Sequence, residues 1–224
     1  MKRKSHVCGE YPLRLYRAFN EEKYARQFVE EGKFRLGLLE VYRTIECRAR
    51  RDGTEGTGHY GLKGQVASIR FSKDPAIDPV CVEKEGVQEW HTENGNSVFL
   101  LCCSDPSAGK EKIRSRFGLH VVEIVSPVSL AIDIDHALNG SDGRGHFNVY
   151  GTYVEYNKGQ LIADGRKSEE LTVLSYTQKP SSFSDEKEFR FCVVAMGVDF
   201  LESRNRKRFL DIDLGEPIRY ASLL

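Results

Sequence analysis

Three carboxylates stand within four positions near the C-terminal end of the chain, in the stretch SDEKEFRF at residues 184–191. Asp185, Glu186 and Glu188 come just before the aromatic run FRFCVVAM, which is typical of a core strand. Strands are usually poor in acidic residues, so paired acids at the start of one suggest a special role. A carboxylate held beside a sugar can stabilise the positive charge that develops when a glycosidic bond breaks.

The alternation of a strand predicts how these side chains are arranged. Glu186, Glu188 and Arg190 should share one face, while Phe189 and Phe191 point to the other face and become buried. Two interpretations stay open. The acids either line a cleft, or they form a solvated strand start that contains an ion pair.

A second candidate is Arg17 in the stretch LYRAF, where it lies between Tyr16 and Phe19. The guanidinium group of an arginine can hold pyrophosphate or ribose oxygens through paired hydrogen bonds. An arginine on an edge strand is an equally ordinary explanation.

Two further stretches could contact a ligand. The glycine-rich stretch DGTEGTGHYG, which contains Glu55 and Tyr60, is predicted to be a loop that lets the backbone approach a ligand closely. It has no G-K-[ST], so it is not a phosphate-binding P-loop. The run RNRKR is either a solvated turn or a phosphate-contacting patch, and its basic residues are Arg204, Arg206, Lys207 and Arg208.

Several other kinds of site are not indicated. There is no G-x-S-x-G nucleophile elbow, and no His/Cys cluster has zinc spacing. Asp133 and Asp135 have no third ligand nearby, and DGTEG lacks the spacing of a calcium loop. We therefore expect no bound metal.

The elements that would position these residues follow from periodicity. Helices are predicted at 21–31, 38–50 and in SAGKEKIRSRFG, mostly in the first half of the chain. Strands are predicted in PLRLYRAF, FRLG, QVASIRF, SVFLLCC, LHVVEIV, SLAIDID, NVYGTYVEYNKG, FRFCVVAM and FLDIDLG, with a hairpin arm in GVQEWHTENGNS. Pro127 is expected to separate the strands LHVVEIV and SLAIDID. This content predicts a sheet-rich α+β fold in one domain over residues 1–224, with residues 1–11 flexible.

Composition narrows the setting. The chain has 224 residues, and its 33 Lys and Arg balance its 33 Asp and Glu, so any basic surface must be local. Six cysteines without a C-x-x-C pair suggest reduced thiols in a cytoplasmic protein. The basic N-terminus is not followed by the apolar region of a signal peptide, and no stretch is long enough to span a membrane.

The order LYRAF, EEGKFRLG, LLEVYRTIECRARRDGTEG and EKEFRF resembles bacterial domains that are distantly similar to ADP-ribosyltransferases. Some of these are toxins of toxin–antitoxin or phage-defence systems, including one that modifies mRNA. The resemblance covers about residues 13–60 and 176–192. It implies a split mixed or antiparallel sheet around an NAD cleft, with helices near the N-terminus.

The resemblance also implies roles for individual residues. Arg17 matches the first-strand residue that holds NAD, Glu188 matches the catalytic glutamate, and Glu186 matches the acid two positions before it. FRLG lacks the Ser-Thr-Ser motif of one branch, and the His-Tyr pair of another branch is found only as His59–Tyr60, outside the first strand. The expected cofactor-binding residues are Tyr16, Arg17, Phe34, Tyr42, Glu55 and Tyr60.

The expected function is thus an NAD-dependent ADP-ribosyltransferase toxin, with NAD as co-substrate and nucleic acid, RNA rather than protein, as acceptor. An antitoxin protein is a further expected partner. Two alternatives stay open, namely a non-enzymatic binding domain of the same fold and a metal-dependent nuclease. NAD consumption separates the first reading from both, and a metal requirement would favour the nuclease.

Overall fold

The computed structural model describes residues 11–44, 57–63, 68–70, 80–81, 86–91, 98–140, 147–154, 156, 163–164, 170–172, 179, 181–195 and 208–224. For the short strands between residues 57 and 91, and for those at 163–164 and 170–172, only the backbone is described.

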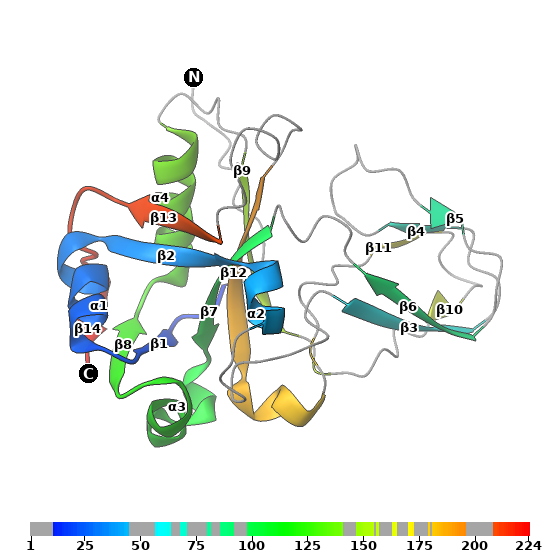
Figure 1. The fold of residues 1–224 in the computed structure, drawn as a ribbon, viewed down its shortest axis with the longest axis horizontal. Coiled ribbons are helices and arrows are strands. Elements are labelled where there is room, and N and C mark those ends of the chain that lie inside the picture. The colour runs from blue at the N-terminus through cyan, green and yellow to red at the C-terminus, as the bar shows by residue number, and fades with distance from the viewer. Residues whose placement is uncertain are drawn as a thin grey trace.

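An eight-stranded antiparallel sheet dominates the fold (Figure 1). Its main path runs through β13 (Phe209–Asp213), β2 (Lys33–Leu38), β7 (Val98–Ser104), β1 (Leu15–Phe19), β8 (His120–Ile124) and β14 (Ala221–Leu223). On the other edge of β7, the sheet continues through β12 (Glu188–Ala195) and β9 (Phe147–Tyr153). Most of these strands were predicted; β14 was not.

The sheet forks along one edge of β7. β2 pairs with the first half of this edge, at Leu100 and Phe99, whereas β1 pairs with its end, at Ser104. None of the described strands pairs with residues 101–103 on this side. β1 and β2 therefore diverge from β7, and a gap opens between them.

The helix predicted at 21–31 is present as α1 (Glu22–Arg26), which continues into the π-helical turn η1 (Gln27–Glu31). Gly32 ends it in the left-handed conformation, with φ of 66°. Ala25 and Phe28 are buried, and Phe28 lies 5.0 Å from Phe34 between ring centroids. The helix predicted at 38–50 appears as α2 (Leu39–Thr44). Leu38 belongs to β2, and residues 45–50 lie outside the described part of the chain.

One predicted strand is wrong. SLAIDID belongs to the helix α4 (Pro127–Asn139), with Pro127 at its first position. Leu130 and Ala131 are buried about one helical turn before the buried Ile134, and this spacing gives α4 an apolar face against the sheet. Pro127 begins a helix because its fixed φ suits the first turn and its missing N–H is not needed there.

Two other expectations about the helices and loops need correction. Helices are not concentrated in the first half, because α4 and most of α3 (Lys110–Phe117) lie in the second half, together with the 3₁₀ turn η5 (Ser181–Glu186). The short 3₁₀ turn η3 (Pro106–Ala108) precedes α3. The second half of the glycine-rich stretch is not a loop, since β3 (Thr57–Lys63) includes TGHYG.

Two small three-stranded sheets complete the described structure. One consists of β10 (Ala163–Asp164), β3 and β6 (Gly86–His91), and the other of β11 (Glu170–Thr172), β4 (Ser68–Arg70) and β5 (Val80–Cys81). β10 pairs in parallel with β3, and β11 pairs in parallel with β4. The other two pairs, β3 with β6 and β4 with β5, are antiparallel. The α+β class is confirmed at this level.

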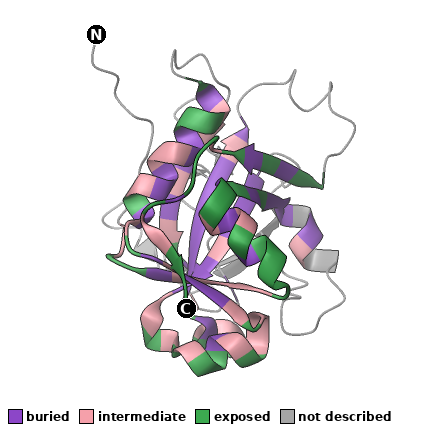
Figure 2. Ribbon diagram, turned by 90° about the vertical axis from the view of Figure 1, so that its left-hand side faces the viewer, coloured by how far each residue is buried: buried purple, intermediate pink, exposed green. Residues whose placement is uncertain are grey.

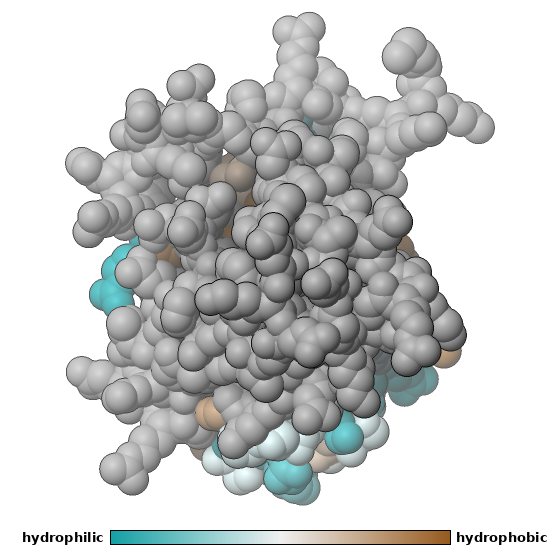
Figure 3. Space-filling view, turned by 90° about the vertical axis from the view of Figure 1, so that its right-hand side faces the viewer, coloured by the Kyte–Doolittle hydropathy of each residue, from teal (hydrophilic) through white to brown (hydrophobic). Residues whose placement is uncertain are grey.

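The two faces of β7 and β12 have different environments. Phe189 and Phe191 enter the main hydrophobic core with Cys103, as the alternation predicted. Cys192 packs on the opposite face with Leu39 of α2. Figure 2 shows the buried strands inside and exposed residues along the outer helices. In the described part of the face in Figure 3, hydrophilic residues gather at its lower rim. Glu188 and Arg190 lie on the α2 face of the sheet.

Among the described residues, no helix is both long and apolar enough to cross a membrane.

Candidate active site

A cavity of about 250 Å³ lies at the fork between β1 and β2. It is slightly smaller than the roughly 300–1,000 Å³ typical of small-molecule sites. Its walls come from elements far apart in the sequence, and the lining residues with polar or aromatic side chains are Tyr16, Arg17, Arg35, Tyr42, Cys102, Ser104, Phe117, Lys179, Glu186, Glu188, Arg190 and Phe209. Arg17 and Glu188, predicted from opposite ends of the chain, thus face one cavity.

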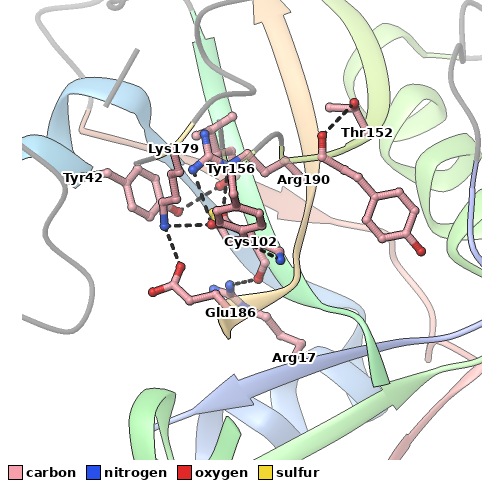
Figure 4. Close-up of polar contacts among 11 residues, drawn as sticks. Arg17, Tyr42, Cys102, Thr152, Tyr156, Lys179, Glu186 and Arg190 are labelled. Atoms are coloured by element: carbon pink, nitrogen blue, oxygen red, sulfur yellow. Dashed lines mark hydrogen bonds and ion pairs between the residues drawn. The ribbon is translucent and has the colours of Figure 1, made fainter. Parts of the chain in front are cut away.

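Glu188 is the first residue of β12, and its carboxylate is buried in ion pairs with Arg190 and Lys179, both labelled in Figure 4. Its Oε1 lies 2.8 Å from Arg190 Nε, and its Oε2 lies 2.8 Å from Lys179 Nζ. The three side chains are only 5%, 1% and 7% exposed, respectively. The ion pair that sequence alternation allowed is present, but it is buried rather than solvated.

These charges decide the protonation of Glu188. Burial by itself would raise the pKa of Glu188, but Arg190 and Lys179 outweigh it and hold the pKa well below its usual range. The backbone N–H of Glu188 donates to the Tyr156 hydroxyl at 2.7 Å. Glu188 is therefore a fixed carboxylate anion at neutral pH.

Glu186 contributes the second acid, although it does not belong to the predicted strand. It ends η5, and Lys187 follows with φ of 44°, an unusual value for a residue other than glycine. Its Oε2 lies 2.8 Å from Lys179 Nζ, while its buried Oε1 has no partner among the described residues. Burial raises the pKa of Glu186, with Glu188 adding to the effect and Lys179 opposing it.

Arg17 fills the fork itself. Its Nη1 donates to the carbonyl of Cys102, which is one of the β7 residues left without a strand partner at the gap. The guanidinium carbon lies 5.6 Å from the ring centroid of Phe19. Its buried Nε has no hydrogen-bond partner among the described residues.

Tyr42 closes the cavity from α2. Its hydroxyl donates to the Leu100 carbonyl at 3.2 Å. Its ring lies so close to Gly37 that a Cβ at this position would come within 2.9 Å of it. Burial raises the pKa of Tyr42 well above its ordinary value, so it stays a neutral phenol.

A second cavity, of about 660 Å³, adjoins the first at the fork. Arg17, Ala18 and Arg35 line both cavities. Arg35 is 68% exposed and pairs with Asp211 at 2.6 Å. Phe34 lines only this second cavity, where it also belongs to the core, so the structure places it apart from the two acids.

The remaining predicted site residues are only partly described. Glu55 lies outside the described residues, and Tyr60 lies in β3, whose side chains are not described. Arg204, Arg206 and Lys207 also lie outside the described residues. Arg208 is exposed, and its carbonyl accepts a hydrogen bond from Leu38 N–H at 2.9 Å.

Sequence reasoning missed three contributors to the site. Lys179 follows a strand-like run and precedes Pro180, and nothing in the local sequence indicates that it is buried. Tyr156 was read only as part of a strand rich in tyrosine. Cys102 was seen only as one of two adjacent cysteines of which one should reach the core. Cys103 is the one in the main core, and both cysteines line the cavity.

The cavity has an excess of positive charge. Four cationic side chains face it against two acids, and these cations are Arg17, Arg35, Lys179 and Arg190. No group of three or more metal-ligating side chains occurs within the described part of the chain. The arrangement suits an anionic ligand with hydroxyl groups better than a divalent cation.

Comparison of the chain with protein-family models, with curated proteins and with solved structures found no match.

Proposed function

We propose that the protein is an NAD-dependent ADP-ribosyltransferase that modifies nucleic acid, RNA rather than protein, as a toxin of a toxin–antitoxin or phage-defence system. The observation that supports the activity most is the meeting of Arg17 and Glu188 at one cavity. The acceptor and the biological role rest on the sequence resemblance and on the run RNRKR.

NAD suits the residues at the fork. Its pyrophosphate is an anion, and Arg17 and Arg35 supply cations where the two cavities join. Its nicotinamide ring suits an aromatic wall, which Tyr42 provides in the smaller cavity. The hydroxyl groups of the attached ribose suit hydrogen-bond acceptors, which Glu186 and Glu188 provide there.

The reaction breaks the bond between the ribose C1′ and the nicotinamide nitrogen. The electron pair of this bond goes to the nicotinamide ring, which leaves uncharged, and C1′ becomes oxocarbenium-like. The fixed negative charge of Glu188 stabilises that state. The acceptor then bonds to C1′ and loses a proton, and Glu186, whose pKa is raised, is the nearest base for it.

A non-enzymatic binding domain is the second candidate. It is favoured by the ion pairs on both oxygens of Glu188, since a purely structural cluster has the same form. The nuclease reading is weaker, because the two acids are already neutralised by Lys179 and Arg190 and form no metal-ligating group among the described residues.

The test is to incubate the purified protein with NAD labelled in its adenylate part, and to offer RNA, DNA and lysate protein separately with a chelator present. Release of nicotinamide with transfer of label to RNA supports the proposal. Transfer of label to protein alone would show that the acceptor is protein rather than RNA. Binding of NAD without release would support the binding domain, and a metal-dependent loss of RNA would support the nuclease.

A further inference from the structure

Lys179 bridges the two acids of the site. Its Nζ lies 2.8 Å from Glu186 Oε2 and 2.8 Å from Glu188 Oε2, and the side chain is 7% exposed. Figure 4 shows the Lys179 side chain with a dashed line to the Glu186 carboxylate. One buried ammonium thus fixes the separation of two acids that come from different elements, η5 and β12.

Arg190 completes the arrangement from the other side of Glu188. Its Nε lies 2.8 Å from Oε1 and its Nη2 lies 3.4 Å from Oε2, so Glu188 has two cationic partners, whereas Glu186 has one among the described residues. Arg190 thus contacts Glu188 from the same strand, β12. Lys179 is the only described ion-pair partner of Glu186.

We propose that Lys179 is a positioning residue of this site, which holds Glu186 and Glu188 side by side against the cavity through one shared ammonium group. The catalytic meaning of this inference rests on the proposed function, but the bridge does not. Without the ammonium, two carboxylates in a buried site repel each other, and both would hold protons to higher pH. The opposite directions of their pKa shifts agree with this division of charge.

Other groups face Glu188 and set the background. Among the described residues, the titratable groups that act on Glu188 besides Lys179 include Arg190 on β12, Glu186 on η5, Cys102 on β7, Tyr156 after β9 and Tyr42 on α2. The pKa of each of the last three is raised, so they are neutral around pH 7. Arg17 on β1 and Arg35 on β2 also face the cavity, but Arg190 and Lys179 are the cations that lower the pKa of Glu188 most, and Glu186 is the neighbouring acid.

The test compares the pH dependence of NAD cleavage in the wild type, Lys179→Met and Lys179→Arg. Methionine keeps the length and apolar stem of lysine but not the charge. In Lys179→Met, the acid limb of the kcat profile should move up by at least about one pH unit, because an opposite charge at this distance shifts a carboxyl pKa by about 1–3 units. Lys179→Arg should keep the wild-type limb.

The matched control is Lys112→Met. Lys112, in α3, pairs at 2.8 Å with Asp185 of the acidic stretch. In this pair the side chains are 48% and 62% exposed, respectively. This control should leave the profile unchanged. If Lys179→Met folds and its acid limb superimposes on that of the wild type, Lys179 only fills space and the inference is wrong.

Two further measurements cover other outcomes. Should Lys179→Met fail to fold, Glu186→Gln is the alternative variant, because it leaves Glu188 as the one charged partner of Lys179 in this bridge. The acid limb of its kcat profile should then move to lower pH, and an upward move would contradict the bridge. Should the wild type not cleave NAD, the proposed function fails. The bridge is then tested by titrating the ¹³C-labelled carboxyl of Glu188 by NMR, which should move upward in Lys179→Met; no movement would overturn it.

Discussion

At the residue scale, two acids separated by one residue have opposite electrostatic environments. Glu188 is held by two cations and is an anion, whereas Glu186 shares one cation and has a buried oxygen without a hydrogen-bond partner in the described part of the chain. Buried ion pairs of this kind add little net stability, because the desolvation penalty offsets the attraction. They do fix geometry and protonation, which are what a carboxylate needs in order to stabilise a developing positive charge.

Arg17→Ala should weaken NAD binding by at least about tenfold, which corresponds to about 1.4 kcal/mol. It should also lower the free energy of unfolding by about 1–3 kcal/mol, because the Cys102 carbonyl loses its donor. Calorimetric titration with NAD measures the first effect, and denaturant unfolding measures the second.

The matched control is Arg14→Ala, since Arg14 forms an exposed pair with Glu123 outside both cavities. It should change neither quantity measurably. Loss of stability in Arg17→Ala without any loss of NAD affinity would make Arg17 a purely structural support for the fork.

At the element scale, the fork depends on a close contact between β2 and α2. Gly37 leaves room for the ring of Tyr42, which a Cβ would approach to 2.9 Å. Gly37→Ala should therefore displace Tyr42 and destabilise the fold by about 1–3 kcal/mol, as overpacking usually does. Denaturant unfolding measures the change.

The same substitution in a Tyr42→Ala background should cost much less, because the ring that it meets is gone. A double-mutant cycle measures this coupling. Additive effects of the two changes would show that Gly37 is not required for the position of Tyr42.

Sequence patterns predicted elements well where the pattern was local. The alternation around Phe189 and Phe191 identified β12 and its buried face, and the spacing of Ala25 and Phe28 identified the first helix. The strand predicted for SLAIDID was wrong because the apolar residues of this stretch fit both a strand and a helix. The spacing of Leu130 and Ile134 favours a helix only if the helix is taken to begin at Pro127.

The site was predictable only in part, for a physical reason. The resemblance to ADP-ribosyltransferases identified Arg17 and Glu188. The helical spacing of apolar residues after residue 38 identified Tyr42. Lys179 was not identified, because its burial depends on acids brought to it by the fold. A lysine before a proline is ordinarily a solvated loop residue.

At the scale of the whole molecule, the acids give stability a defined pH dependence. The pKa of Glu188 is lowered in the folded state, so its contribution is present above the unfolded value of about 4.3 and is lost as the pH falls below it. Glu188→Gln should therefore destabilise by about 3–5 kcal/mol near neutral pH, and this gap from the wild type should shrink in acid.

Glu186→Gln should behave differently. The pKa of Glu186 is raised in the folded state, so its ionisation costs stability above about pH 4.3 and costs none below. Denaturant unfolding near neutral pH should show stability unchanged or increased for this variant. Equal losses for both variants would contradict the division of charge between the acids.

The proposed nucleic acid acceptor implies a salt-dependent surface. If RNRKR contacts phosphates, neutralising Arg206, Lys207 and Arg208 together should flatten the slope of log K against log salt for RNA binding by about 2–3 units. Stability should change little, because solvated charges contribute little. RNA binding with an unchanged slope would remove this run from the acceptor site.

The central claim is that Glu188 acts on the transition state of NAD cleavage, and single-turnover nicotinamide release by Glu188→Gln tests it most directly. The rate should fall by roughly 10²-fold or more while NAD affinity is nearly kept, because the lost charge matters mainly in the transition state. Glu123→Gln, which breaks the pair with Arg14 outside the cavity, should keep the wild-type rate. A folded Glu188→Gln protein that releases nicotinamide as fast as the wild type would contradict the account.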